Sequence, residues 1–276
     1  MIRLYLTRDG PRLERDGRCM RPAGDFTIDK LFAAADPCAT AGASFADGAE
    51  CPLPSGELRA PIQSQEIWAA GVTYLRSKSA RMAESKDAGG GTFYDRVYDA
   101  DRPELFFKGT PHRVAAPGTG VRLRSDSNWN VPEPELTLAV SSSGQIFGYT
   151  IGNDMSSRDI EGENPLYLAQ AKVYDRSTAI GPALVITEEL PLPSTAILLE
   201  IRRKGAVAFA GETTISQIRR SLPSLAEWLF RDNSFPYGTY LMTGTGIVPP
   251  DSFTLEPGDE IRITIEPVGT LVNPVM

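Results

Sequence analysis

Histidine is nearly absent from this chain of 276 residues, because His112 is the only one. A zinc site built on several imidazoles needs more than one histidine, and most hydrolytic triads use histidine as the general base. The sequence therefore excludes such a zinc site and most hydrolytic triads. His112 follows Pro111 in a segment that is typical of a loop, where a structural or exposed side chain is expected. Catalysis must then depend on carboxylates, lysine or a metal ion.

Cysteine is also scarce, and its placement along the chain indicates no site. Cys19, Cys38 and Cys51 are the three cysteines, and all of them lie in the first fifth of the sequence. Their odd count and wide spacing match neither zinc-binding motifs nor a disulfide framework. We expect these cysteines to have no functional role.

Clustered positive charge and long apolar runs are lacking as well. The net charge is -7, and no run rich in lysine or arginine is present to displace the counterions of a nucleic acid. No stretch of about 18 apolar residues could span a membrane, and the residues after Met1 do not form the apolar stretch of a signal peptide. We therefore expect a cytoplasmic protein whose partner is a small molecule, with no nucleic acid and no membrane as partner.

Composition divides the chain near residue 60. Residues 1–34 alternate weakly between apolar and polar types, and residues 35–58 are rich in Ala, Gly, Pro, Ser and Asp. The chain is 41% hydrophobic and long enough to bury a sizeable core. The sequence predicts a small N-terminal lobe and connector over residues 1–60 and a larger domain over residues 61–276.

Short strands and turns dominate the larger domain. Apolar residues alternate with more polar ones over 135–140, and a Ser-Ser-Ser-Gly turn leads into residues 145–151, which predicts a β-hairpin. Other segments with strand patterns are residues 67–72, 197–203 and 260–266. One helix is predicted to begin at Ser224, which forms a capping box with Glu227, and to stop near Asn233. The fold class is therefore α+β, mainly β.

Two glutamates on one predicted strand indicate chemistry. Side chains alternate along a strand, so Glu133 and Glu135 project from the same face. Two carboxylates at such a short separation repel each other unless one is protonated or a cation lies between them. Pro132 and Pro134 indicate a bent or edge strand. Because a Glu-x-Glu pair on a strand is more often a solvated face, that interpretation stays open beside the metal site.

A third carboxylate belongs to the same group. The partner strand of the hairpin ends at Asp154, which should return to the end of the sheet where the two glutamates lie. Three hard anionic oxygen ligands, without imidazole or thiolate, suit Mg²⁺, with Mn²⁺ or Ca²⁺ as alternatives. Polar residues between 153 and 172 would orient the ligands and bind substrate. We predict a metal site at Glu133, Glu135 and Asp154.

These residues also carry a resemblance to a known family. Glu133-Pro134-Glu135, the segment Asn153 to Asp159, and Lys172 followed by Ile180-Gly181-Pro182 occur in the order and spacing of the fumarylacetoacetate hydrolase family. The resemblance covers roughly residue 61 to the C-terminus. It implies a mixed β-roll as the catalytic domain over residues 61–276, a Mg²⁺ ion bound by the matching carboxylates, and a homodimer or homotetramer.

Within the family, the motifs are most similar to those of enzymes that dehydrate 2-keto-3-deoxy sugar acids. The segments 101–104, 131–135 and 161–167 carry this similarity. The family's hydrolases commonly have a histidine shortly after a Gly-x-Asn-Tyr segment, and the matching residues here, 71–78, contain none. The resemblance therefore favours a metal-dependent hydro-lyase acting on a small 2-oxo acid. Two alternatives are a hydrolase of acylpyruvates or diketo acids and a non-catalytic metal-stabilised binding protein.

The resemblance also implies an acid and a base. Lys172 and Glu104 match the family's acid/base pair, and we expect Lys172 to remove the proton at C3 and Glu104 to assist the loss of the C4 hydroxyl. A lysine near a divalent cation loses its proton more readily than in water, which favours this order. The alternatives are a salt bridge between Lys172 and a ligand carboxylate, and an exposed charge at Glu104.

Candidate substrate contacts surround this pair. The planar fork of Arg158 suits a substrate carboxylate or a metal-ligand carboxylate. Ser156 and Thr245, the latter in the loop Thr243-Gly244-Thr245-Gly246, are further candidates, as is Arg76. Arg81 and Lys108 could also reach a hydroxyl or carboxylate from a lid. Residues 75–87, which lead to the glycines at 89–91, could form that lid or a simple surface insertion.

Overall fold

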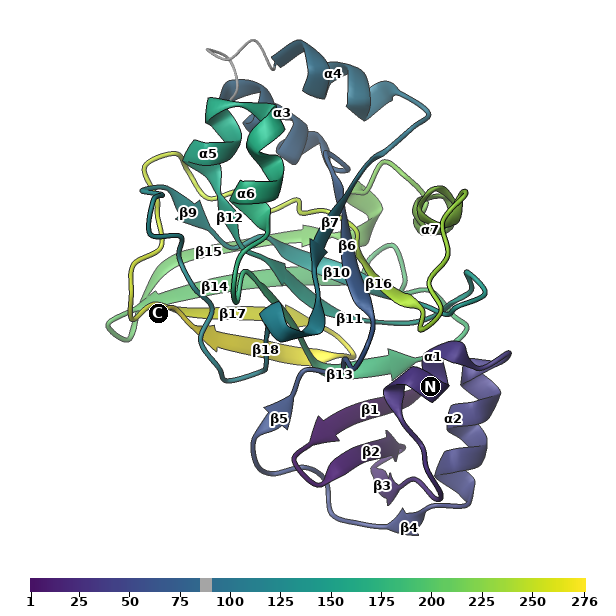
Figure 1. Ribbon diagram of the computed structural model, residues 1–276. Helices are drawn as coiled ribbons and strands as arrows, with labels where there is room; N and C mark the ends of the chain where they lie inside the picture. The colour runs from purple at the N-terminus through teal and green to yellow at the C-terminus, as the bar shows by residue number, and fades with distance from the viewer. Residues whose placement is uncertain (85–90) are drawn as a thin grey trace.

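The computed structural model describes residues 1–84 and 91–276, and β-strands dominate it (Figure 1). The strands are β1 (Ile2–Thr7), β2 (Gly10–Arg15), β3 (Arg18–Arg21), β4 (Ala49–Glu50), β5 (Leu58–Arg59), β6 (Glu66–Gly71), β7 (Glu104–Gly109), β8 (Val114–Ala115), β9 (Asn130–Val131), β10 (Pro134–Val140), β11 (Ile146–Asp154), β12 (Ser156–Ser157), β13 (Thr178–Ile186), β14 (Ala196–Arg203), β15 (Ala206–Thr214), β16 (Thr239–Met242), β17 (Glu260–Ile265) and β18 (Gly269–Pro274). The α-helices are α1 (Ile28–Ala33), α2 (Pro37–Ala46), α3 (Leu75–Glu84), α4 (Gly91–Asp99), α5 (Arg158–Glu163), α6 (Leu168–Lys172) and α7 (Leu222–Phe230), and the short 3-10 helices are η1 (Pro111–Arg113), η2 (Pro165–Tyr167) and η3 (Ile215–Gln217).

A large sheet organises the molecule. Its strands follow the order β4-β3-β2-β1-β13-β11-β10-β16-β6-β7, with β5 beside β1 and β8 beside β13. The predicted hairpin is confirmed as the antiparallel pair β10–β11, and the strand predicted at residues 67–72 is β6. The prediction of an edge strand at the two prolines was wrong, because β10 lies between β11 and β16, and the alternative of a bent strand stays a prediction. Pro134 is the first residue of β10, and β16 pairs only with Thr137–Val140, so no neighbour needs the missing proline N–H.

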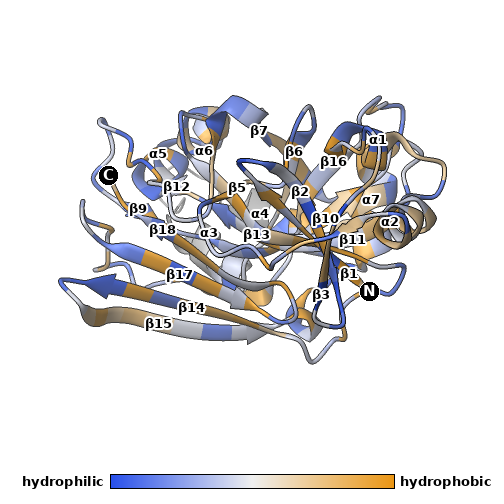
Figure 2. Ribbon diagram, turned by 90° about the horizontal axis from the view of Figure 1, so that it is seen from below, coloured by the Kyte–Doolittle hydropathy of each residue, from blue (hydrophilic) through white to orange (hydrophobic). Residues whose placement is uncertain are grey.

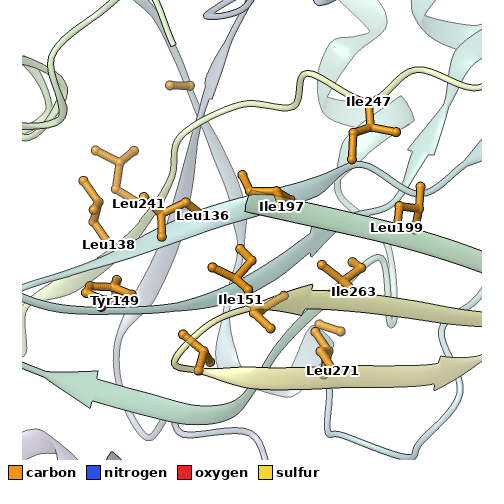
Figure 3. Close-up of a cluster of buried hydrophobic side chains, with 14 of the residues drawn as sticks. Leu136, Leu138, Tyr149, Ile151, Ile197, Leu199, Leu241, Ile247, Ile263 and Leu271 are labelled. Atoms are coloured by element: carbon orange, nitrogen blue, oxygen red, sulfur yellow. The ribbon is translucent and has the colours of Figure 1, made fainter. Parts of the chain in front are cut away.

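A second sheet packs against the first and encloses the main core. Its order is β15-β14-β17-β18, and β14 and β17 confirm the strands predicted at 197–203 and 260–266. Hydrophobic and polar residues alternate along β17 (Figure 2), and burial alternates along both strands, so one face of each strand is buried. Ile197 and Ile263 point toward Leu136 and Ile151 of the large sheet (Figure 3). Each such side chain contributes about 1.5–3 kcal/mol by leaving water.

The N-terminal lobe is joined to the large sheet through strand pairing. Strands β1 to β4 extend that sheet, because β1 pairs antiparallel with β13 (Figure 1). Phe32 of α1 packs edge-on against Phe147 of β11, with ring centroids 4.8 Å apart, and lies 5.1 Å from the Tyr240 ring of β16. The lobe therefore shares a core with the central strands. A domain boundary at residue 60 stays a prediction.

The helices lie mainly at the edges of the sheets. Helix α7 begins earlier than predicted, because Ser221 rather than Ser224 is its N-cap and accepts a hydrogen bond from the Ser224 backbone N–H. Pro223, with its fixed φ, suits the first turn. Leu225 and Leu229 are buried, whereas Trp228, which the helical pattern also predicts to be buried, is half-buried. Within the described residues, no helix is long and apolar enough to cross a membrane.

Helices α3, α5 and α6 gather at the end of the large sheet opposite the N-terminal lobe (Figure 1). The polar stretch predicted as a lid or an insertion forms α3 over Leu75–Glu84. Gly89 and Gly90 of the predicted hinge lie outside the described residues, and Gly91 begins α4. Both interpretations of this stretch stay predictions.

The contact between the lobe and the sheet generates a stability prediction. Replacing Phe32 with Ala should lower the free energy of unfolding by about 3–5 kcal/mol, because it leaves a cavity against Phe147 and Tyr240. Chemical denaturation followed by circular dichroism measures this change. Leu53→Ala is the matched control in the same lobe, since Leu53 is 52% exposed, and should change the value by less than about 0.5 kcal/mol. Equal effects of the two substitutions would contradict the shared core.

Candidate metal and active site

Three carboxylates meet where β10 and β11 pair. Backbone hydrogen bonds between Glu133 and Asp154, at 2.9 and 3.2 Å, place these two residues directly opposite each other. Glu135 lies opposite Gly152, where a Cβ would lie 2.2 Å from Thr137 Oγ1, so this position requires glycine. One oxygen from each of the three carboxylates lies within 4.8 Å of the others, and all three residues are buried. The hairpin register thus brings together the residues predicted as metal ligands.

Lys172 lies against this cluster. It ends the short helix α6, and its Nζ is 2.6 Å from Glu133 Oε2 and 3.0 Å from Asp154 Oδ2. Nζ also contacts the Ser156 hydroxyl and lies 3.3 Å from Glu161 Oε1. Lys172 is fully buried, and its Nζ is surrounded by protein oxygens. The salt bridge to ligand carboxylates is present, and the same position brings Lys172 to the predicted metal site.

Two further cations fix the ligand carboxylates. Lys108 is fully buried on β7, and its Nζ lies 2.7 Å from Asp154 Oδ1 and donates to the carbonyls of Met155 and Lys172. The expectation that Lys108 reaches the substrate from a lid was therefore wrong, since strand pairing places Lys108 inside the large sheet. Arg158 donates from its guanidinium to Glu133 Oε1 at 3.0 Å. Two roles were considered for Arg158, binding a substrate carboxylate or a metal-ligand carboxylate. The structure shows the contact to Glu133, a predicted metal ligand.

Electrostatics in this site are dominated by buried acids. Glu133, Glu135, Asp154 and Glu161 are all at most 5% exposed, and the buried cations are Lys108, Arg158 and Lys172. Burial raises the pKa of Glu135 well above its ordinary value, and the charges of Asp154 and Glu133 raise it further. Burial also lowers the pKa of Lys108, against the opposing effect of Asp154. A divalent cation would relieve the repulsion among the carboxylates.

A glycine loop supports Glu135 from the other side. The Gly244 backbone N–H donates to Glu135 Oε2. Gly244 has a φ of +93°, and a Cβ there would lie 2.0 Å from Thr73 Oγ1, so only glycine fits. Thr245, the next residue, lines the same cavity as the carboxylates. The loop predicted to bind a substrate carboxylate therefore also positions a predicted metal ligand.

The residues present fit a hard divalent cation. Carboxylate oxygens bind Mg²⁺ at about 2.1 Å and Ca²⁺ at up to about 2.6 Å, so two oxygens on one ion lie no more than about 4.2 Å apart for Mg²⁺ and about 5.2 Å for Ca²⁺. The oxygens of Glu133, Glu135 and Asp154 lie within 4.8 Å of one another, which meets the Ca²⁺ limit, and they would move slightly closer around Mg²⁺. The absence of imidazole and thiolate from the three residues favours Mg²⁺, Mn²⁺ or Ca²⁺ over zinc.

Glu104 lies next to Gly71, a residue that lines the cavity. It begins β7, opposite Gly71 of β6. A Cβ at position 71 would lie 2.0 Å from Glu104 Oε2, so this close approach requires glycine. The Glu104 side chain is half-buried rather than an exposed charge.

The remaining candidates lie at different distances from the cavity. Ser156 is buried and bonded to Lys172, so it belongs to the site. Arg76 is exposed on α3 and lines a separate groove with Tyr74 and Phe209, so its substrate role stays a prediction. The side chain of Arg81 lies outside the described residues. His112 is exposed, as expected, and its Nδ1 is hydrogen-bonded to the Thr110 hydroxyl.

Two charged residues of the site had only a weak signal in the sequence. Lys108 follows Phe106 and Phe107 in an apolar strand, and a lysine in such a strand signals a buried partner. Glu161 begins the segment 161–167 that carries the family similarity, but no local pattern predicts its contact with Lys172, which depends on the position of α5.

Proteins of known sequence resemble the chain over most of its length. A probable 2-keto-3-deoxyxylonate dehydratase from Haloferax volcanii is 49% identical over 216 residues, which cover 78% of this chain and 73% of the relative. A 2-dehydro-3-deoxy-D-arabinonate dehydratase from Saccharolobus solfataricus is 45% identical over 218 residues, with the same coverage of 78% and 73%.

Solved structures resemble the fold. A 2-keto-3-deoxy-D-arabinonate dehydratase complexed with magnesium and 2,5-dioxopentanoate has a TM-score of 0.81 and 34% identity, covering 99% of this chain and 98% of its own. A hexagonal crystal form of 2-keto-3-deoxyarabinonate dehydratase has a TM-score of 0.83 and 34% identity, with the same coverage. Residues 66–276 match the model of the fumarylacetoacetate (FAA) hydrolase C-terminal family. With this match over most of its length, the chain belongs to the fumarylacetoacetate hydrolase family.

Proposed function

We propose that the protein is a Mg²⁺-dependent hydro-lyase that converts 2-keto-3-deoxy-D-arabinonate to 2-oxoglutarate semialdehyde, a step of sugar acid catabolism. The observation that carries the proposal is the buried group of Glu133, Glu135 and Asp154 with Lys172 against it. It is supported by relatives named as dehydratases of such acids, at 45% and 49% identity. The proposed product is 2,5-dioxopentanoate, the compound with which a similar dehydratase is complexed in its solved structure.

The proposed reaction removes one molecule of water. A proton leaves C3 and the hydroxyl leaves C4, which gives a C3=C4 double bond next to the C5 alcohol. A proton then leaves C5 and another is added at C3, which moves the double bond to C4=C5. The resulting enol becomes the semialdehyde when C4 gains a proton and the C5 hydroxyl loses one. The 2-keto group makes the C3 proton the acidic one, since the electron pair left at C3 is delocalised onto the keto oxygen. The site must therefore hold the 2-keto acid end and move protons near C3 and C4.

Glu133, Glu135 and Asp154 would hold the cation. When bound, Mg²⁺ would supply an electrophile at the carboxylate and keto oxygens of the substrate, which lowers the pKa of the C3 proton. Arg158 keeps Glu133 in place, Lys108 keeps Asp154 in place, and the Gly244 N–H keeps Glu135 in place. These contacts fix the ligand oxygens before substrate arrives.

Lys172 and Glu104 are the proposed acid/base pair. Lys172 Nζ stands at the edge of the carboxylate group, where a proton acceptor can reach C3 of a ligand bound there. Glu104 would protonate the departing C4 hydroxyl from the wall formed by Gly71. Ser156, Thr245, Arg158 and Arg76 complete the proposed contacts to substrate.

The proposal extends to organisation, assembly and location. We propose that residues 61–276 form the catalytic domain, which is supported by the cavity, whose lining residues lie between Ala70 and Thr245. Residues 1–60 then form the N-terminal lobe and connector. A homodimer or homotetramer in the cytoplasm is proposed from the family resemblance, and the exposed Val207 on the edge strand β15 is consistent with a partner chain.

Hydrolysis of acylpyruvates or diketo acids is the second candidate. It needs a group that activates water, and the family's histidine has no counterpart at residues 71–78. The single histidine of the chain, His112, is not among the described residues that line the carboxylate cavity. Dehydration is therefore the favoured activity.

The first test compares the two activities directly. Proton NMR of the Mg²⁺-loaded protein should show 2-oxoglutarate semialdehyde forming from 2-keto-3-deoxy-D-arabinonate, and no pyruvate and acetate forming from acetylpyruvate. Treatment with EDTA should abolish the reaction, and added Mg²⁺ should restore it. If acetylpyruvate is cleaved and 2-keto-3-deoxy-D-arabinonate is not dehydrated, the protein is a hydrolase and the proposal is wrong.

The second test concerns the metal ligands. Glu135→Gln should weaken Mg²⁺ binding by at least about 100-fold in calorimetry, because loss of groups that merely orient a ligand already costs about 10–100-fold. Mg²⁺ should raise the Tm of the unmodified protein and not that of the variant. Exposed Glu227 offers the matched control Glu227→Gln, which should bind Mg²⁺ normally. If Glu135→Gln binds Mg²⁺ with unchanged affinity, Glu135 is not a metal ligand.

The third test separates base from acid. Lys172→Met should lower kcat by about 10²–10⁴-fold and stop deuterium from D₂O entering C3 of the substrate. Glu104→Gln should slow water loss by a similar factor while exchange at C3 continues. Lys204→Met, at an exposed turn, is the control for lysine removal. Exchange that persists in Lys172→Met and stops in Glu104→Gln would reverse the two roles.

A further inference from the structure

We propose that Cys19 and Cys51 are a site of reversible disulfide formation in the N-terminal lobe. Their sulfur atoms lie 3.4 Å apart although the residues are 32 positions apart in the chain. Their spacing in the chain did not indicate this pair, because only the pairing of β3 with β4 brings Cys51 beside Cys19. The proposal is independent of the proposed dehydratase activity.

Strand pairing places the two cysteines opposite each other. Met20 of β3 pairs antiparallel with Glu50 of β4, and the Cys51 N–H donates to the Cys19 carbonyl at 2.9 Å, which continues this register by one residue. Directly opposed residues of such strands have Cβ atoms about 4.5–5.5 Å apart, and a disulfide needs about 3.5–4.5 Å. Closing the bond therefore requires the sulfurs to approach to about 2 Å with only a small adjustment at a short edge strand.

The two thiols differ in access to solvent. Cys51 is half-buried, whereas Cys19 is 3% exposed. Burial raises the pKa of the Cys19 thiol to about 12, and the neighbouring Cys51 raises it too, while the nearby Arg12 opposes the rise. Cys51 is thus the residue that an oxidant meets first, and Cys19 is positioned to resolve the product.

A small-molecule disulfide such as oxidised glutathione supplies the oxidant. The Cys51 thiolate attacks one glutathione sulfur, forming a mixed disulfide and releasing one glutathione thiolate. The Cys19 sulfur then attacks Cys51 Sγ, forming the Cys19–Cys51 bond and expelling the second thiolate. The two cysteine protons end on two molecules of reduced glutathione, so the cysteines are oxidised and glutathione is reduced.

The bond would close a loop that contains α1 and α2. That loop carries Phe32, which packs against the central strands at Phe147 and Tyr240. Crosslinking restricts the unfolded chain more than the folded one, so oxidation should raise the Tm by several degrees. The residues that line the carboxylate cavity lie outside this loop, so the crosslink should leave Mg²⁺ binding unchanged.

The experiment uses the full chain, incubated with oxidised glutathione, denatured, alkylated and measured by intact mass and peptide mapping. We expect the loss of two hydrogen atoms, a crosslinked peptide pair containing Cys19 and Cys51, and a free Cys38. Dithiothreitol should reverse the change. Cys38→Ser is the matched control and should form the crosslink normally, whereas Cys19→Ser and Cys51→Ser should not form it.

Other products would overturn the proposal. These are three free thiols after oxidation, glutathione retained on Cys51 without a crosslink, or a bond that involves Cys38. Mapping of the unmodified chain decides among these products without any variant, so poor folding of Cys19→Ser would not affect the result. Thermal melts of the oxidised and reduced forms provide the second readout, and equal Tm values would overturn the predicted stabilisation of the lobe.

Discussion

Four buried carboxylates, those of Glu133, Glu135, Asp154 and Glu161, repel one another, and the surrounding structure is arranged to hold them together. Burial in a low-dielectric interior strengthens this repulsion and raises the pKa of Glu135. Each of the other three acids, Glu133, Asp154 and Glu161, contacts a buried cation. These cations are Lys108, Arg158 and Lys172. The cations come from β7, α5 and α6, so a strand must meet two helices that follow it by about 50 residues before the acids can share one space.

The sheet provides the rigidity that this arrangement needs. β10 and β11 lie near the middle of the large sheet, and the second sheet packs on the face that carries Leu136 and Leu138. Glu135 projects from the opposite face because side chains alternate along β10. A slip of one residue in the β10–β11 pairing would turn the carboxylates into the hydrophobic core, so the core itself fixes the register of the site.

This construction explains why a divalent cation and a 2-oxo acid suit the site. The oxygens of Glu133, Glu135 and Asp154 are held by Arg158, Gly244 and Lys108, so little reorganisation is needed when a cation binds. Lys172, the proposed base, already lies against Glu133 and Asp154. The N-terminal lobe extends the same sheet through the pairing of β1 with β13, and its cysteine pair lies away from the residues that line the site.

The sequence alone determined the features that depend on local spacing. Alternation at Glu133 and Glu135, and a hairpin returning at Asp154, were enough to predict the carboxylate group, and the motifs around Lys172 indicated the family. Only the tertiary structure decided that β10 is central, that Lys108 and Glu161 belong to the site, and that Cys19 meets Cys51. These features depend on contacts between residues far apart in the chain, which are set by strand order and core packing, and no pattern of neighbouring residues encodes them.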